Sequence, residues 1–204
     1  MTWTQKTRIF RLTSLLLLYP AEDKTAFYAR IEAVYSALTL MPESRAAQLL
    51  QNMLSRWQAV SLETLCEEYV LTFDFAEGSC LYLTAHEFGD NRSRGEAMVE
   101  LHQMYRAGGF VQATAELPDY LPMLLEFLSL FGEDPQTQAL QERLALMCHR
   151  VLSHMQQNGL FNGVFLALVT VLPKVEYGDE TTAFPNREPA DTDDLPYPLQ
   201  HQIL

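Results

Sequence analysis

Cysteine and basic residues are both scarce in this sequence, and each shortage excludes several classes of protein. The 204 residues include three cysteines, Cys66, Cys80 and Cys148, and no Cys-x-x-Cys pair. This pattern argues against a disulfide framework, a zinc knuckle or an iron–sulfur centre, and it favours reduced thiols in the cytoplasm. The 14 Lys and Arg residues against 26 Asp and Glu residues give a net charge of −12. Such acidity opposes binding to nucleic acid or to anionic lipid. An acidic surface attracts basic peptides, but it also keeps a protein soluble without any such partner, and both interpretations stay open.

Motifs for nucleotide binding and nucleophilic catalysis are also missing. The chain has no Gly-x-Gly-x-x-Gly, no Gly-x-x-x-x-Gly-Lys-Ser/Thr loop and no Gly-x-Ser-x-Gly turn. Its longest apolar run, residues 164–172, is far shorter than the roughly 20 residues that span a bilayer. We therefore expect no bound cofactor, no membrane insertion and no intrinsic catalysis.

Apolar residues at helical spacing are the clearest pattern that is present. Phe27, Ile31, Val34 and Leu38 share one helical face, and similar stripes recur throughout residues 1–173. Proline and glycine residues separate the stripes, as expected at helix ends. No alternating pattern typical of strands competes with them. The sequence therefore predicts an all-α, single-domain bundle of about eight helices.

The composition changes after Pro173. Residues 175–204 hold seven acidic side chains, one arginine and four prolines. A segment of this kind buries too little apolar surface to offset the entropy lost on ordering. We expect residues 174–204 to form a mobile acidic tail, with a local anchor at residues 195–199.

His86 is the best candidate for a metal ligand. Asp90 follows it by four residues, the spacing of one helical turn, but Gly89 lies between them and no second pair occurs nearby. A small helical metal-dependent hydrolase that uses His86 with Asp90 or Asp119 is the alternative function from the enzyme class. A structural subunit of a larger complex is a third possibility.

Three short motifs follow one another in the middle of the chain. Phe73-Asp74 ends one helical stripe. Residues 81–95 read Leu-Tyr-Leu-Thr-x-His-x-x-Gly-Asp-x-Arg-x-Arg-Gly, and residues 116–122 read Glu-Leu-Pro-Asp-Tyr-Leu-Pro.

Each motif has a structural and a functional interpretation. Arg92 and Arg94 can pair with Asp74 or Asp119 across helices, or bind a carboxylate on a partner. Pro118 suits the first turn of a helix, which acidic neighbours stabilise. In the functional interpretation, Glu116 and Asp119, which lie close to Tyr120 in the sequence, bind a basic amphipathic peptide. Taken alone, the residues leave both interpretations open.

The ordered motif set resembles the NarJ family, the delta chains of respiratory nitrate reductases, within the larger group of TorD, DmsD and NarJ chaperones. The resemblance covers about residues 60–131. It implies a TorD-like helical fold and a cytoplasmic, non-enzymatic chaperone. Such a chaperone binds the N-terminal segment of an immature molybdenum-enzyme catalytic subunit, permits insertion of the molybdopterin cofactor and delays membrane docking. Cofactor-insertion proteins are further expected partners.

The resemblance also implies which residues matter. As candidates for client contact or for specifying the fold, it indicates Asp74, Tyr82, Leu83, His86, Asp90, Arg92, Arg94, Glu116, Pro118, Asp119 and Tyr120. Tyr82, Leu83 and His86 otherwise fit an inward helical face, so only the resemblance makes them groove candidates. Related chaperones that bind twin-arginine signal peptides often have histidine where this chain has Tyr120. This difference weakens inference from those relatives about how the position forms hydrogen bonds. The resemblance implies the α subunit of nitrate reductase as the leading client. Because the motif also appears in assembly chaperones for related enzymes, another related molybdenum oxidoreductase is the alternative.

Overall fold

The computed structural model describes residues 2–20 and 23–188, and these residues form α-helices and short 3₁₀ segments without a β-strand. This confirms the all-α prediction. The helices in chain order are α1 (Trp3–Leu16), α2 (Lys24–Thr39), α3 (Arg45–Trp57), α4 (Leu62–Phe73), α5 (Leu83–Phe88), α6 (Ser93–Ala107), α7 (Leu121–Phe131), α8 (Gln138–His154), α9 (Asn162–Val171) and α10 (Glu180–Ala183). The 3₁₀ segments are η1 (Glu77–Ser79) and η2 (Pro135–Thr137).

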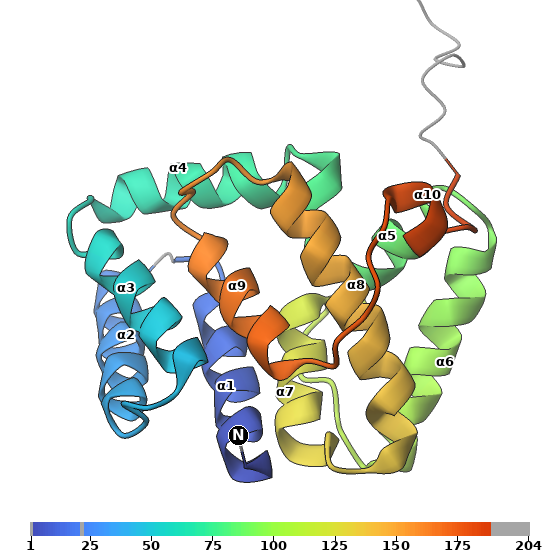
Figure 1. Cartoon of the computed structure of the whole chain (residues 1–204), viewed down its shortest axis with the longest axis horizontal. Helices are drawn as coiled ribbons and strands as arrows, with labels where there is room; N and C mark the ends of the chain where they lie inside the picture. Colours follow the sequence, from blue (N-terminus) through green and yellow to red (C-terminus); the bar gives the residue numbers. More distant parts are fainter. Residues whose placement is uncertain (1, 21–22, 189–204) are drawn as a thin grey trace, which may run out of the picture.

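Helix α9 lies at the centre of the bundle. It packs against α1, α3 and α8, while α1 also packs against α7 and α3 against α2 (Figure 1). The short α5 packs against both α6 and α8. Since α5 carries the middle sequence motif, this arrangement holds that motif between two longer helices.

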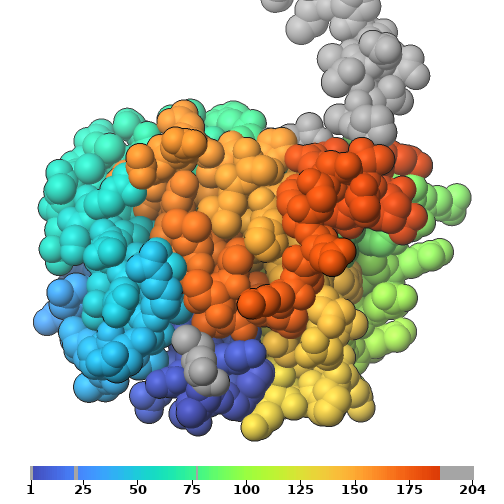
Figure 2. All heavy atoms as spheres, viewed as in Figure 1, coloured from blue at the N-terminus to red at the C-terminus, as the bar shows by residue number. Residues whose placement is uncertain are grey.

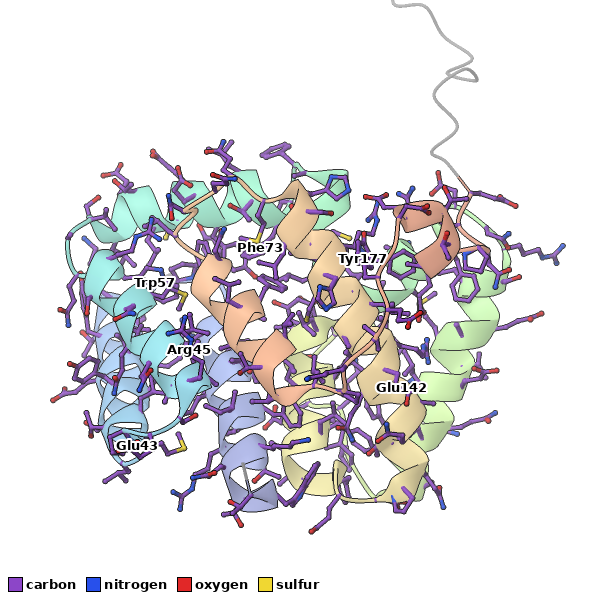
Figure 3. All side chains as sticks on the ribbon, viewed as in Figure 1. Glu43, Arg45, Trp57, Phe73, Glu142 and Tyr177 are labelled. Atoms are coloured by element: carbon purple, nitrogen blue, oxygen red, sulfur yellow. The ribbon has the colours of Figure 1, made fainter. Side chains whose placement is uncertain are left out.

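An aromatic cluster joins α3, α4 and α9. The Phe161 ring lies 5.1 Å from Trp57, 5.6 Å from Tyr69 and 5.2 Å from Phe73, measured between ring centroids. All four side chains are buried, and Figure 3 shows Trp57 and Phe73 among the helices. The edge-to-face geometry adds to the stabilisation from burial of apolar surface. The apolar stripes therefore identified this part of the core.

The start of α4 agrees with the sequence pattern, whereas the start of α7 differs from the position predicted from Pro118. Ser61 caps α4, because its Oγ accepts a hydrogen bond from the Thr64 backbone N–H at 3.0 Å. Pro118, however, does not lie in the first turn of a helix. Helix α7 begins at Leu121, and Pro122 occupies its first turn. Pro118 lies instead in a turn, in which the Tyr120 N–H donates to the Leu117 carbonyl at 3.1 Å. Tyr120 then pairs with Tyr82, which precedes α5, before α7 begins.

Two helical glycines should respond in opposite ways to alanine. A Cβ at Gly163 in α9 would lie 2.6 Å from Met53 Cβ on α3, whereas a Cβ at Gly95 in α6 would meet nothing within 4 Å. We expect Gly163→Ala to lower the free energy of unfolding by about 1–3 kcal/mol through overpacking. Gly95→Ala should raise it by roughly 0.5–1 kcal/mol, because alanine loses less backbone entropy in a helix. Urea denaturation of both variants checks this, and equal shifts of the same sign would contradict it.

The domain boundary at residue 173 stays a prediction. Residues 174–188 nonetheless lie against the bundle, as Figure 2 shows where this segment crosses α8, and Phe184 within it is buried. Residues 189–204, including the anchor predicted at 195–199, lie outside the described residues.

Candidate functional site

The second and third motifs meet through backbone pairing. Tyr82 and Tyr120 form an isolated antiparallel bridge. The Leu83 N–H donates to the Asp119 carbonyl at 3.0 Å, and the Leu121 N–H donates to the Leu81 carbonyl at 2.7 Å. This pairing, which we call the motif bridge, places the start of α5 beside the start of α7.

Asp119 lies fully buried at the motif bridge and caps α5 from a distant part of the chain. Its Oδ2 accepts hydrogen bonds from the Thr84 N–H at 3.1 Å and the Thr84 hydroxyl at 2.5 Å. Arg94 donates to the same hydroxyl at 3.1 Å and lies 3.8 Å from the carboxylate. The carboxylate thus satisfies a free N–H of the first turn of α5 and favours its positive end. The predicted pairing of Arg94 with Asp119 is confirmed, and the burial of Asp119 removes it from the surface.

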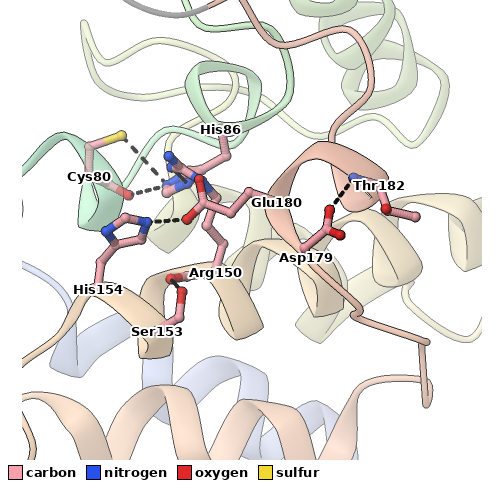
Figure 4. A network of polar contacts seen from close by, with 8 residues as sticks. All are labelled: Cys80, His86, Arg150, Ser153, His154, Asp179, Glu180 and Thr182. Carbon is pink, nitrogen blue, oxygen red and sulfur yellow. Dashed lines mark hydrogen bonds and ion pairs between the residues drawn. The ribbon is translucent and has the colours of Figure 1, made fainter.

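His86 is buried between α5 and α8, where both of its ring nitrogens have hydrogen-bond partners (Figure 4). Nε2 donates to the Cys80 carbonyl at 2.8 Å, and Nδ1 accepts from Arg150 Nη1 at 2.8 Å. Arg150 is buried as well, and its Nε lies 3.1 Å from Glu180 of α10. Burial lowers the pKa of His86 to about 4, with Arg150 as a further cause.

This geometry opposes the alternative function in which His86 and Asp90 bind a metal. Asp90 is exposed in the turn after α5, and Arg150 places a positive charge at the imidazole. Among the described residues no group of three or more His, Cys, Asp or Glu side chains is arranged to hold a metal ion.

The outward side of the motif bridge borders a cleft of about 690 Å³. We call it the α1–α7 cleft, because α1, residues 110–116 and the start of α7 line it. Its apolar lining consists of Leu15, Leu18, Tyr19, Phe110, Val111, Ala113, Ala115, Tyr120, Pro122 and Met123. Its charged residues are Arg11, Glu116 and Glu126, and Arg11 pairs with Glu126. An apolar floor with carboxylates at its rim suits a basic amphipathic segment.

The motif tyrosines connect this cleft to the motif bridge. The Tyr82 hydroxyl donates to Glu116 at 2.9 Å, and the Tyr82 and Tyr120 rings lie 5.5 Å apart. The Tyr120 and Tyr69 hydroxyls lie 3.4 Å apart. Burial raises the pKa of both Tyr82 and Tyr120, so these phenols are neutral near pH 7. Tyr82 therefore holds the Glu116 carboxylate in place through a neutral donor.

The remaining predicted residues are separate from this cleft. Asp74 is exposed at the end of α4, and Arg92 is exposed before α6. Pro118 is partly buried, and its carbonyl accepts from the Tyr105 hydroxyl at 2.6 Å. Leu83 is fully buried.

The structure thus places the predicted residues in different environments. Leu83, His86 and Asp119 point inward, whereas Glu116 and Tyr120 line the cleft. Sequence reasoning missed the partners of the buried group, Thr84, Arg150 and Glu180. Helical periodicity carries no signal for them, since it does not say which polar residues meet.

A second pocket of about 420 Å³ lies between α2, α3 and the start of α4. It is lined mainly by apolar and aromatic side chains, and Glu32 is its one charged residue. None of the predicted motif residues lines it. It therefore serves as a control site for the α1–α7 cleft, because it is an apolar pocket of the same protein without motif residues.

The fold resembles that of a solved protein from Archaeoglobus fulgidus whose structure is described as a putative redox enzyme maturation protein. That crystal structure aligns with a TM-score of 0.61 over 80% of this chain and 91% of that one. The identity is 18%, so this likeness concerns the fold alone. Among the described residues, no helix has both the length and the apolar character required to cross a bilayer.

The sequence relatives define the family within this class. A profile of the family described as nitrate reductase delta subunit matches residues 39–158. The chain is 30% identical over 175 residues to the probable nitrate reductase molybdenum cofactor assembly chaperone NarJ of Bacillus subtilis, covering 84% of this chain and 90% of that protein. It is 29% identical over 187 residues to the probable chaperone NarW of Escherichia coli, covering 90% of this chain and 76% of that protein.

The chain therefore belongs to the nitrate reductase delta subunit family. The NarJ and NarW relatives are named as assembly chaperones and not as catalytic enzymes. The resemblance identified from the three motifs is confirmed, and the hydrolase alternative is excluded.

Proposed function

We propose that this protein is a cytoplasmic chaperone that binds the N-terminal segment of an immature nitrate reductase α subunit. It holds that subunit while the molybdopterin cofactor is inserted and before the complex docks at the membrane. The observation that carries the proposal is the α1–α7 cleft, which lies beside the family motifs and has Glu116 at its rim, while Glu126 there is paired with Arg11. The names of the relatives support the assembly role.

The lining of the cleft suits a peptide that folds into an amphipathic helix on binding. Leu15, Leu18 and Met123 offer apolar surface to one face of such a helix. A basic residue beside that face can pair with Glu116, while the net charge of −12 favours the approach of a basic peptide. Ordering the peptide costs several kcal/mol, so we expect moderate affinity with high specificity.

Calorimetry with a synthetic peptide of the α-subunit N-terminal segment tests the proposal. Glu116→Lys should weaken binding by about 1–1.5 kcal/mol, because it reverses an exposed charge at the rim. Binding by the unsubstituted protein should also weaken as salt rises, since exposed charges are screened over about 8–10 Å. The matched control is Glu32→Lys, which makes the same exposed charge change at the second pocket.

The two variants distinguish the possible sites. If Glu32→Lys weakens binding and Glu116→Lys does not, the second pocket binds the client and the cleft assignment is wrong. If the α-subunit peptide fails to bind while the corresponding peptide of another molybdenum oxidoreductase binds, the client is that enzyme.

Mass spectrometry of co-purified proteins should find this chain with the immature α subunit. Its stoichiometric presence in the mature complex would instead indicate a structural subunit.

A further inference from the structure

Residues 174–188 make a series of contacts that continue beyond the last long helix. We call this segment the C-terminal clasp. At its start the Tyr177 ring stacks on His149 of α8, with ring centroids 5.6 Å apart. Farther along, Asp179 caps α10 by accepting a hydrogen bond from the Thr182 N–H at 2.8 Å, and Phe184 is buried. The clasp therefore has a defined course over α8.

The clasp ends at the turn between α5 and α6. The Glu188 N–H donates to the Phe88 carbonyl at 3.1 Å, and Asn91 donates to the Glu188 carboxylate at 2.8 Å. Gly89 adopts φ +58°, and a Cβ there would lie 2.2 Å from the Glu188 carbonyl oxygen. Glycine at this position therefore permits the close approach of two backbone segments. The clasp thus contacts α8 near its start and the turn after α5 at its end.

Glu180 forms the polar connection between the clasp and α5. Its carboxylate contacts Arg150 Nε at 3.1 Å and also pairs with His154, while Arg150 Nη1 donates to His86 Nδ1 at 2.8 Å (Figure 4). The Arg150 side chain is 3% exposed, and guanidinium stays charged inside proteins. A buried charge without a partner is costly, so Arg150 depends on Glu180.

Tyr82 directly precedes α5, and His86 lies four residues farther along, within this helix. The backbone of the first turn of α5 therefore links His86 to Tyr82. Tyr82 in turn donates a hydrogen bond to Glu116 at the rim of the α1–α7 cleft. The clasp and the cleft are thus connected through the side chains of Arg150 and His86 and through the first turn of α5.

We propose that the clasp holds α5 in place and that Glu180, acting through Arg150 and His86, is a positioning residue for the Tyr82–Glu116 side of the α1–α7 cleft. The effect on client binding rests on the proposed function. The effect on α5 does not, because it can be measured in the protein without a peptide.

Hydrogen exchange and peptide binding on the full-length protein test the two effects separately. We compare Glu180→Gln with Glu176→Gln, a control in the same segment whose side chain is exposed. In Glu180→Gln, the amides of α5 should exchange about tenfold faster, while those of α3 should keep their rates. The dissociation constant for the α-subunit peptide should rise by about three- to tenfold at a temperature where both variants are folded. Glu176→Gln should change neither quantity.

Each result decides a different point. Unchanged exchange in α5 overturns the clasp, whether or not the peptide binds. Faster exchange with unchanged affinity overturns the positioning role, because a purely structural contact would behave in this way. If the unsubstituted protein does not bind the peptide, the proposed function fails, and the exchange rates still decide whether the clasp holds α5 in place.

Should Glu180→Gln fold poorly, the double variant Arg150→Met/Glu180→Gln removes both charges. Faster exchange in α5 is again expected there, and unchanged exchange overturns the proposal.

Discussion

Replacing Asp119 by alanine is expected to lower the free energy of unfolding by about 2–4 kcal/mol. Asp119 is fully buried and accepts two hydrogen bonds from Thr84, so its loss leaves the first turn of α5 without a cap. Arg94 loses the same carboxylate, although its side chain is 29% exposed and regains some solvation. Asp119 Oδ1 is buried and accepts no hydrogen bond from the described residues, which offsets part of the loss.

Thermal denaturation checks this prediction, since the expected change corresponds to roughly 5–15 °C in melting temperature for a domain of this size. Glu142→Ala serves as the control because Glu142 is exposed on α8 (Figure 3). The structure favours a fold-specifying role for Asp119 over direct contact with the client. An Asp119→Ala protein with unchanged melting temperature but weaker peptide binding would contradict that assignment.

The stability of the protein should fall as the pH falls from about 6.5 towards 4. His86 is neutral in its buried site, where its pKa is lowered to about 4 from the ordinary value of 6.5. Between these two values the unfolded chain binds a proton at this histidine and the folded protein does not. Stability therefore decreases towards low pH, by an amount that reaches about 3 kcal/mol when the pH approaches 4.

Urea denaturation at several pH values between 5 and 6.5 measures this effect. This pH range lies above the ordinary pKa of a glutamate. Partial burial raises the pKa of the neighbouring Glu180, but His154 and Arg150 lower it by more, so that its net shift is downward. His86→Gln should flatten the pH dependence, because glutamine does not titrate. His102→Gln, at an exposed position on α6, should leave it unchanged. Equal slopes in all three proteins would show that another group is responsible.

The positions of most helices follow from the sequence, because burial of one helical face leaves a periodic record. Phe27, Val34 and Leu38 were assigned to an inward face, and all are buried. Proline, glycine and capping residues marked the ends, as Ser61 shows for α4. The order of the three motifs was also sufficient to identify the family. Apolar periodicity, helix-end residues and the order of motifs can all be read along the chain. Their identification therefore does not depend on how the helices pack.

The role of each motif residue was decided by tertiary structure. Asp119 meets Thr84 across 35 residues, and His86 meets Arg150 across 64. A helical stripe shows which face is buried, but it does not show which helix covers that face or which polar groups meet there. A charged residue is usually exposed, and only a specific partner makes its burial favourable. The sequence alone therefore determined the helices and the family. Packing determined that Asp119 lies inside, that Arg150 meets His86, and that Glu116 and Tyr120 face the cleft.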